Sequence, residues 1–352
     1  MASARQRGWW RGIHFLALGV LCFFVIACAS STKSMSTSAV SLHNPLAPVA
    51  DPFIVYHNKS YYLTGTHTGN SLEIWHSPRL EDVGHSAKTI WTPATGEPAF
   101  QVWSPSMFLL DYQGSSHWFV YFTAALTDKN EDHRIYVLQS QGSDPLGPYV
   151  YKGQLTGTAN ETAIDASILQ LNGKLYMMYV LERGTNATYL APMSDPLTVS
   201  GKPRLIIDPD QPWEQGFQAH STYPVAEGPE ALYHDGKTFI VYSASDTGNY
   251  NYCLGLMTYQ GGDPLESSSW HKKGPVFEYS SDNGVFGPGR AHFTTSPDGK
   301  QSWMVYHAKT SADFTYDGRE VRAQPFTWNA DGSPNFGVPV SLKQPLNPPS
   351  GE

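Results

Sequence analysis

Hydrophobic and polar residues alternate in a pattern that occurs five times along the chain. Each copy has a short apolar run with alternating polar positions, a turn of the type Asn-Lys, Gln-Gly, Asn-Gly or Asp-Gly, and a second run rich in Tyr and Val. This pattern is typical of a β-hairpin, because alternation gives each strand one buried face and the turn residues tolerate the tight backbone. The copies begin 52, 62, 62 and 60 residues apart, at Asp51, Trp103, Asp165, Glu227 and Gly287. That period is long for a solenoid repeat and fits one propeller blade with its loops.

We therefore predict an all-β fold, a five-bladed β-propeller over residues 44–352. No segment of useful length has helical periodicity, and no domain break is visible after Asn44. Two further short strands are predicted within 319–340, where they would complete the first or last blade and close the ring. A composition of 40% apolar and only 15% charged residues suits one large β domain with many turns.

The first residues have a different character. Three arginines precede an apolar stretch over about 15–27, which is shorter than a comfortable membrane span and typical of a secretory signal. The stretch ends in Val-Ile-Ala-Cys28, which resembles a bacterial lipobox, so we predict a signal peptide over 1–27 and lipid attachment at Cys28. Residues 28–43, rich in Ser and Thr, are predicted to be a flexible tether. Because Ala29 rather than Asp follows the cysteine, the expected location is the outer membrane if the host has one, or otherwise the periplasm or cell surface.

Charge and cysteine content narrow the range of partners. The net charge of −8 becomes −11 once the three arginines of residues 1–27 are removed. An acidic chain without a Lys/Arg run argues against nucleic acid or anionic polymers as ligands and favours a neutral substrate. Of the three cysteines, Cys22 lies in the signal and Cys28 would carry lipid, which leaves only Cys253. No internal disulfide or CxxC metal site is then expected, and we expect the protein to act as a monomer.

Three copies of the repeat place a carboxylate at the start of their first strand. Asp51, Asp165 and Glu227 each precede or interrupt an apolar run, which is a poor place for a solvated surface residue. A capping role at turns is the alternative, but radial symmetry would bring these equivalent positions together on the axis. Glycoside hydrolysis needs two carboxyl groups with separated pKa values, and a third carboxylate nearby raises the pKa of the acid by repulsion.

Glu230 is a second candidate for the acid because it lies three residues after Glu227. In an extended strand, residues at positions i and i+3 point to opposite faces, so only one of the two is expected to face the axis. Glu230 begins an apolar Ala-Leu-Tyr run, whereas Gly-Pro follows Glu227. Glu227 is the preferred candidate.

At these residues the chain resembles glycoside hydrolase family 43, a family of five-bladed propeller enzymes that act on arabinan and xylan. The resemblance covers essentially all of residues 44–345 and rests on six short motifs in a fixed order, namely Ala50-Asp51-Pro52, Trp103-Ser104-Pro105, Ile164-Asp165-Ala166-Ser167, Glu227-Gly228-Pro229, Gly287-Pro288-Gly289 and Val305-Tyr306-His307. It implies an inverting mechanism. Asp51 would be the general base that activates water, Glu227 the general acid, and Asp165 the residue that tunes and orients Glu227.

The resemblance also implies roles for other polar residues. A His just after the glycine motif often helps to hold a metal through waters, so His292 is the expected metal residue and a structural Ca²⁺ in the central channel is implied. Here, however, Arg290 directly follows the glycines, and a structural role for His292 is the alternative. Arg290 and Arg322 are expected to bind substrate. Trp103 is the expected subsite wall, because sugar C–H faces pack on aromatic rings. No cofactor is expected to be required for the chemistry itself.

The function implied is that of an exo-acting α-L-arabinofuranosidase on plant cell-wall polysaccharides or oligosaccharides. A β-xylosidase or an endo-arabinanase of the same fold is the alternative within the enzyme class. A sugar-binding propeller without catalysis is the alternative outside it, although such a protein would have no use for all three carboxylates.

Overall fold

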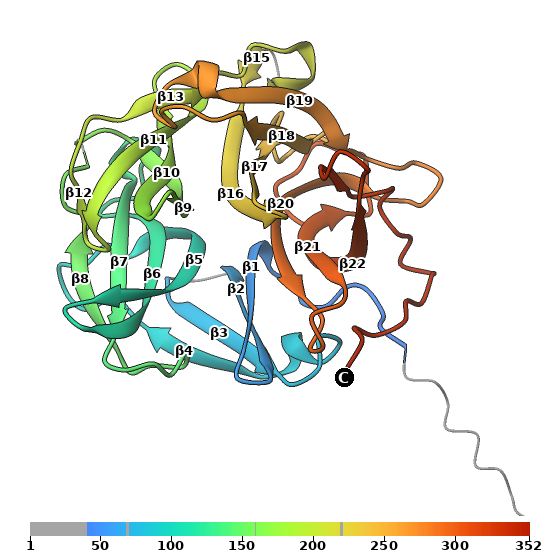
Figure 1. Ribbon diagram of the computed structural model, residues 1–352, viewed down its shortest axis with the longest axis horizontal. Coiled ribbons are helices and arrows are strands. Elements are labelled where there is room, and N and C mark those ends of the chain that lie inside the picture. Colours follow the sequence, from blue (N-terminus) through green and yellow to red (C-terminus); the bar gives the residue numbers. More distant parts are fainter. Residues whose placement is uncertain (1–40, 68–69, 159, 219–220) are drawn as a thin grey trace, which may run out of the picture. The chain divides into compact units, whose positions relative to one another are not determined.

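The computed structural model describes residues 41–67, 70–158, 160–218 and 221–352. The predicted signal peptide, Cys28 and all but the last three residues of the predicted tether lie outside the described residues. Within the described part, five sheets are arranged in a ring around a central axis, which confirms the predicted all-β five-bladed propeller (Figure 1). None of the helices in this part of the chain is long and apolar enough to cross a membrane.

Each blade is an antiparallel sheet whose strands follow one another in sequence from the axis outward. Blade one comprises β1 (Ala50–His57), β2 (Ser60–Thr66), β3 (Leu72–Ser77) and β4 (Ala87–Trp91). Blade two comprises β5 (Phe100–Tyr112), β6 (Ser115–Ala125), β7 (Arg134–Ser140) and β8 (Tyr149–Gln154). Blade three comprises β9 (Ala163–Leu171), β10 (Lys174–Glu182), β11 (Asn186–Asp195), β12 (Thr198–Val199) and β13 (Arg204–Ile207).

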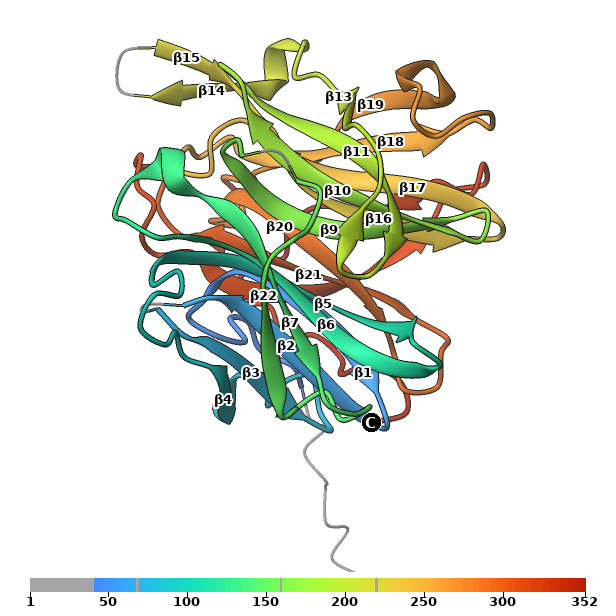
Figure 2. The same cartoon turned by 90° about the vertical axis from the view of Figure 1, so that its left-hand side faces the viewer.

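The last two blades have the same order. Blade four comprises β16 (Ala226–His234), β17 (Lys237–Ala244), β18 (Cys253–Tyr259) and β19 (Trp270–Phe277), and blade five comprises β20 (Phe286–Thr295), β21 (Ser302–Lys309), β22 (Glu320–Trp328) and β23 (Pro334–Asn335). A hairpin of β14 (Gln215–Gln218) and β15 (Ser221–Pro224) projects from the ring between blades three and four (Figure 2). In the described part of the chain, four three-residue 3₁₀ helices lie in the connections, namely Val83–His85, Asn130–Asp132, Pro212–Glu214 and Ser267–Ser269.

Hydrophobic clusters fill the five junctions between neighbouring blades. Tyr121 of blade two and Tyr179 of blade three are buried in one of them, and Ile54 of blade one packs with Trp303 of blade five in another. Burial of apolar surface is the main favourable term in folding, so each blade is stabilised mainly against its two neighbours. Each strand therefore packs one of its faces into one junction and the opposite face into the next.

The ring is closed by residues near both ends of the described chain. β22 and β23 extend blade five, as the sequence predicted for 319–340, and the backbone of Ala47 pairs with that of Val321 on β22. Leu42 is completely buried, and its backbone N–H donates to the carbonyl of Leu346 at 2.8 Å. The folded domain therefore includes Leu42, which the sequence had assigned to the tether.

Candidate active site

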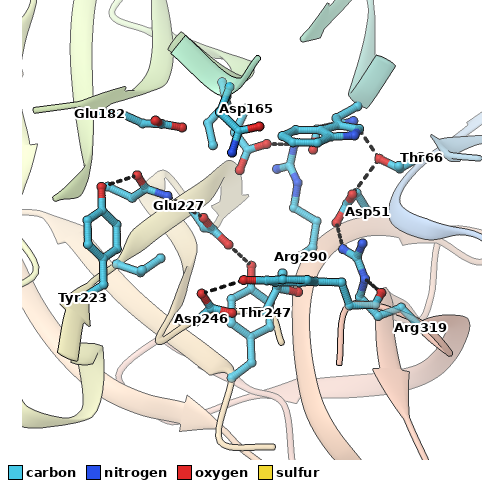
Figure 3. Close-up of a pocket in the computed structure, with 18 of the residues that line it drawn as sticks. Asp51, Thr66, Asp165, Glu182, Tyr223, Glu227, Asp246, Thr247, Arg290 and Arg319 are labelled. Carbon is cyan, nitrogen blue, oxygen red and sulfur yellow. Dashed lines mark hydrogen bonds and ion pairs between the residues drawn. The ribbon is translucent and has the colours of Figure 1, made fainter. Parts of the chain in front are cut away.

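A cavity of about 510 Å³ lies where the first strands of the blades begin, around the axis (Figure 3). All three predicted carboxylates line it, together with residues from every blade. The lining residues are Asp51, Thr66, Trp103, Ser104, Asn130, Ile164, Asp165, Glu182, Asn186, Tyr223, Val225, Glu227, Asp246, Thr247, Tyr252, Arg290, Tyr316, Asp317 and Arg319.

The first strand of each blade has a β-bulge at its pocket end, and the bulge turns side chains toward the axis. The pairing register shifts beside Asp51, Asp165 and Glu227, and equivalent shifts occur in β5 and β20. Asp51 and Asp165 have positive φ angles of 51° and 58°, as do Ser104 at 48° and Arg290 at 52°. Such backbone is unusual for residues other than glycine and clusters at functional sites. The repeat therefore carries a local distortion that turns polar side chains toward the axis.

Asp51 is held as a carboxylate by several donors. The Thr66 hydroxyl donates to Oδ2 at 2.6 Å and itself accepts from the Ser104 N–H, while Nη1 of Arg319 lies 3.2 Å from Oδ1. Burial raises the pKa of Asp51, but the Arg319 guanidinium leads the opposing influences, and the pKa lies well below its ordinary range. Burial lowers the pKa of His307 to about 4, so the ring is neutral near pH 7 and Nδ1 accepts the Asp51 N–H at 3.0 Å.

Glu227 lies in the opposite electrostatic environment. Burial and the nearby Asp165 carboxylate raise the pKa of Glu227 to about 8, despite hydrogen bonds that favour its charged form. The Tyr252 hydroxyl donates to Oε1 at 2.8 Å, and the Asn186 amide donates to Oε2 at 3.2 Å. Near pH 7 this carboxyl group is therefore largely protonated while Asp51 is ionised.

Asp165 contacts both the backbone next to Glu227 and the guanidinium of Arg290. Its Oδ2 accepts the N–H of Gly228 at 2.9 Å, which fixes the backbone directly after Glu227. Its Oδ1 lies 3.6 Å from Nη2 of Arg290, and Nη1 of the same guanidinium lies 3.6 Å from Glu230. Arg290 thus places a buried positive charge between two carboxyl groups and also lines the pocket.

Glu230 also faces the channel, contrary to the expectation that only one of the two glutamates could do so. The bulge between Glu227 and Glu230 interrupts the two-residue alternation of β16. Glu230 lies deeper than the pocket, where it accepts a hydrogen bond from Ser167 at 2.8 Å. Burial raises its pKa to about 8. Glu227 is the one of the two that lines the pocket, in agreement with the preferred assignment.

The surroundings of His292 do not fit the expected metal. Its Nδ1 accepts the N–H of Ile54 at 3.3 Å, and burial lowers the pKa of the ring to about 3. In a neutral ring the proton is then on Nε2, which lies 3.7 Å from Glu230, so neither nitrogen offers a free lone pair to an ion. Within the described residues, no group of three or more His, Cys, Asp and Glu side chains is arranged to hold a metal. Arg290 supplies a positive charge beside Glu230.

Trp103 and Arg322 were both expected to contact the substrate, but of the two only Trp103 lines the pocket. Trp103 lines the pocket and packs against His133 at a ring-centroid distance of 4.3 Å. Arg322 is completely buried, lies outside the pocket and is 3.9 Å from Glu320, so its position does not support the expected substrate contact. Arg319, three residues earlier, is the arginine beside Asp51. The Asp-Gly turn before it was the only local signal that could have indicated a loop reaching the pocket.

Sequence reasoning also missed several polar residues of the pocket. Asp246 is buried beside Glu227, where its charge raises the pKa of that group further, and Glu182 lines the wall near Asp165. Neither occupies a position that repeats between blades, so the periodicity gave no reason to select them. Together with Asn186 and Tyr223 they provide donors and acceptors for a polyhydroxylated ligand.

The arrangement can perform acid–base chemistry on a neutral polar substrate. One carboxylate accepts a proton and one carboxylic acid donates a proton within the same pocket, because their environments separate the two pKa values.

Comparisons with known proteins agree with this geometry. Residues 42–334 match the family model described as Glycosyl hydrolases family 43. The chain is 34% identical over 341 residues to the extracellular exo-alpha-(1->5)-L-arabinofuranosidase of Streptomyces avermitilis, covering 92% of this chain and 69% of that protein. A protein of the same name from Streptomyces chartreusis is 30% identical over 286 residues, with 78% and 84% covered. The crystal structure of an α-L-arabinofuranosidase from Lactobacillus brevis superposes with a TM-score of 0.78 at 32% identity, covering 86% of this chain and 98% of that one. The chain therefore belongs to glycosyl hydrolases family 43.

Proposed function

We propose that this protein is an exo-acting, inverting α-L-arabinofuranosidase that releases terminal arabinofuranose from arabinan, arabinoxylan side chains or arabino-oligosaccharides. The observation that carries the proposal is the opposite environment of two carboxyl groups in one pocket, with the pKa of Asp51 lowered and that of Glu227 raised. The substrate assignment is supported by relatives at 30–34% identity that are named exo-arabinofuranosidases.

The reaction is a single displacement. Asp51 removes a proton from water as the water oxygen attacks the anomeric carbon from one face of the sugar. The bond from the anomeric carbon to the leaving oxygen breaks on the opposite face, and its electron pair stays on that oxygen. Glu227 donates its proton there, so the products are a sugar of inverted configuration and a neutral alcohol.

Asp165 supports the acid in two ways. Its charge helps to keep Glu227 protonated, and its hydrogen bond from Gly228 fixes the backbone that carries Glu227. Arg290 lies 3.6 Å from both Asp165 and Glu230, and its positive charge offsets part of the charge on Asp165.

The direct test is hydrolysis of an aryl α-L-arabinofuranoside, an aryl β-D-xyloside and linear arabinan, with NMR of the fresh product anomer. We expect the arabinofuranoside to be cleaved with inversion. Preference for the xyloside would identify a β-xylosidase, internal cleavage of arabinan would identify an endo-arabinanase, and a retained anomer would contradict the mechanism.

Leaving-group dependence separates the two roles. Glu227→Gln should bind substrate but lose most activity on alkyl glycosides, because an amide cannot donate the required proton, and an activated aryl leaving group should partly restore the rate. Asp51→Asn should be inactive on both, since water activation does not depend on the leaving group. Equal restoration of the two variants would refute the assignment.

Export and lipid attachment at Cys28 are part of the same proposal. They are supported by the signal-like sequence of residues 1–27 and by the word extracellular in the names of two relatives. Cys28→Ala should move the protein from the membrane to the soluble fraction or block its processing, and unchanged membrane fractionation would argue against the lipobox.

A further inference from the structure

The connection from β21 to β22, residues 310–319, presents aromatic side chains beside the pocket. Phe314 and Tyr316 are 47% and 49% exposed, and their rings pack edge to face with centroids 5.4 Å apart. Tyr316 lines the cavity, and Phe314 lies next to it against Gly248, where a Cβ would come within 2.9 Å of the ring. Neighbouring exposed aromatic rings at the edge of a polar pocket have no role in the packing of the blades and form a surface suited to a ligand.

The backbone that carries these rings is fixed by a buried lysine. Lys309 is 1% exposed, and its ammonium donates to the carbonyls of Gly248, Thr315 and Asp313 at 2.6, 3.1 and 3.4 Å. The N–H of Thr315 also donates to the carbonyl of Gly248 at 3.0 Å. The connection is therefore tied to the loop after β17, and binding to its rings would require little ordering of the backbone.

The aromatic pair lies at the exposed edge of the pocket, next to Asp246. The Tyr316 hydroxyl donates to Oδ2 of Asp246 at 3.2 Å, and Asp246 is near enough to Glu227 to raise its pKa. Figure 3 shows Asp246 and Glu227 on one side of the pocket and Asp51 on the other. The carbonyl of Tyr316 accepts from Nε of Arg319 at 3.0 Å, so the connection also contacts the arginine beside Asp51. An exo-acting enzyme holds the terminal sugar inside its pocket, so the sugar on the leaving oxygen must lie toward the exposed edge, where both rings are found.

We propose that Phe314 and Tyr316 form a platform that binds the first sugar residue of the leaving group, a pentose whose C–H face packs on the rings. This inference rests on the proposed function. Trp103 lines the same pocket and would contact the sugar whose glycosidic bond is cleaved, so the two aromatic sites bind different residues of one substrate.

The test compares two substrates that differ in the presence of a leaving-group sugar. Both α-1,5-arabinobiose and methyl α-L-arabinofuranoside need proton donation by Glu227, but only the first has a sugar ring to place on the platform. Phe314→Ala should lower kcat/KM about tenfold for the disaccharide and change it less than about twofold for the methyl glycoside. In a Glu227→Gln background, Phe314→Ala should weaken arabinobiose binding in calorimetry by the same factor.

Matched variants control for folding. Phe314→Trp keeps an aromatic face and should retain the preference for the disaccharide. Tyr233→Ala removes an aromatic ring of equal exposure, 47%, at the far end of β16 and should change neither substrate. Equal losses on both substrates, or no loss on either, would overturn the platform. If the unsubstituted enzyme instead cleaves xylobiose and methyl β-D-xyloside, the proposed arabinofuranoside substrate is wrong. The effect of Phe314→Ala on kcat/KM for these two xylosides then tests the platform. If no pair is cleaved or bound, both proposals fail.

Discussion

Replacement of Arg319 by methionine should move the acid limb of the pH–rate profile to higher pH. Asp51 must be ionised to accept a proton from water, and Nη1 of Arg319 lies 3.2 Å from its Oδ1. The two side chains are only 16% and 12% exposed, so solvent and salt screen the pair poorly. Methionine retains much of the side-chain volume but removes the charge, which makes the ionised form of Asp51 less stable.

The size of the shift follows from this contact. At an effective dielectric constant of about 20, two unit charges 3.2 Å apart attract by about 5 kcal/mol, which is an upper limit. Opposite charges at such distances usually lower an Asp pKa by about 1–3 units, so an upward shift of that size is expected. The raising influence of burial remains in the variant, and the pKa of Asp51 should rise toward its ordinary value of about 3.9. Even at a pKa of about 6, roughly nine-tenths of the base is ionised at pH 7, so kcat/KM there should change little through Asp51.

The substitution should also change the pH dependence of stability. An Asp whose pKa is depressed by folding stabilises the protein above its unfolded pKa, and this contribution is lost as the pH falls through the folded value. The variant should therefore unfold at a lower temperature than the unsubstituted protein at pH 7, and the difference should shrink only below about pH 4, where Asp51 of the folded variant becomes protonated.

The assay is kcat/KM for an aryl α-L-arabinofuranoside between pH 3 and 9. Arg319→Lys keeps a positive charge and should shift the acid limb less than methionine does. Arg183→Met removes an arginine whose ion pair with Glu161 is well exposed and outside the pocket, and it should leave the profile unchanged. A uniform loss of kcat/KM at every pH would show that Arg319 acts on substrate or folding, and a limb that moves to lower pH would refute the electrostatic reasoning.

Two further substitutions test the acid and its backbone. Asp165→Asn should move the basic limb of kcat/KM to lower pH by about 1–2 units, because loss of the charge lowers the pKa of Glu227 and the proton is lost earlier; a fixed limb in the same assay would remove Asp165 from the tuning role. Gly228→Ala should lower the free energy of unfolding in urea by about 1–3 kcal/mol, since φ is +57° and the new Cβ would come within 2.7 Å of the Arg290 side chain. Gly236→Ala, with φ +75° and open space around it, reports the backbone cost alone, and an equal loss there would mean that contact with Arg290 is unimportant.

The inner strands of the propeller could be predicted because hairpins are local. Alternation and turn residues within about 20 positions determine which strands pair, and β1–β2, β9–β10 and β16–β17 formed as the repeats indicated. The positions of Asp51, Asp165 and Glu227 followed from the same periodicity, since equivalent positions of a radial repeat must meet near the axis.

What the sequence could not supply depends on non-repetitive and long-range contacts. The bulge in β16 turns both Glu227 and Glu230 inward, because each side chain there finds a partner on another blade. Arg319 reaches Asp51 although it belongs to an irregular connection, while Arg322 on the regular strand β22 is buried away from the pocket.

The sequence by itself therefore determined the hairpins, their number and the phase at which carboxylates meet. The tertiary structure decided which carboxyl group carries a proton, because that depends on charges and burial contributed by other blades. Arg319 of blade five holds the base of blade one ionised, and Asp165 of blade three keeps the acid of blade four protonated. Such long-range electrostatic contacts leave no periodic signal in the chain, and they exist only once the ring has closed.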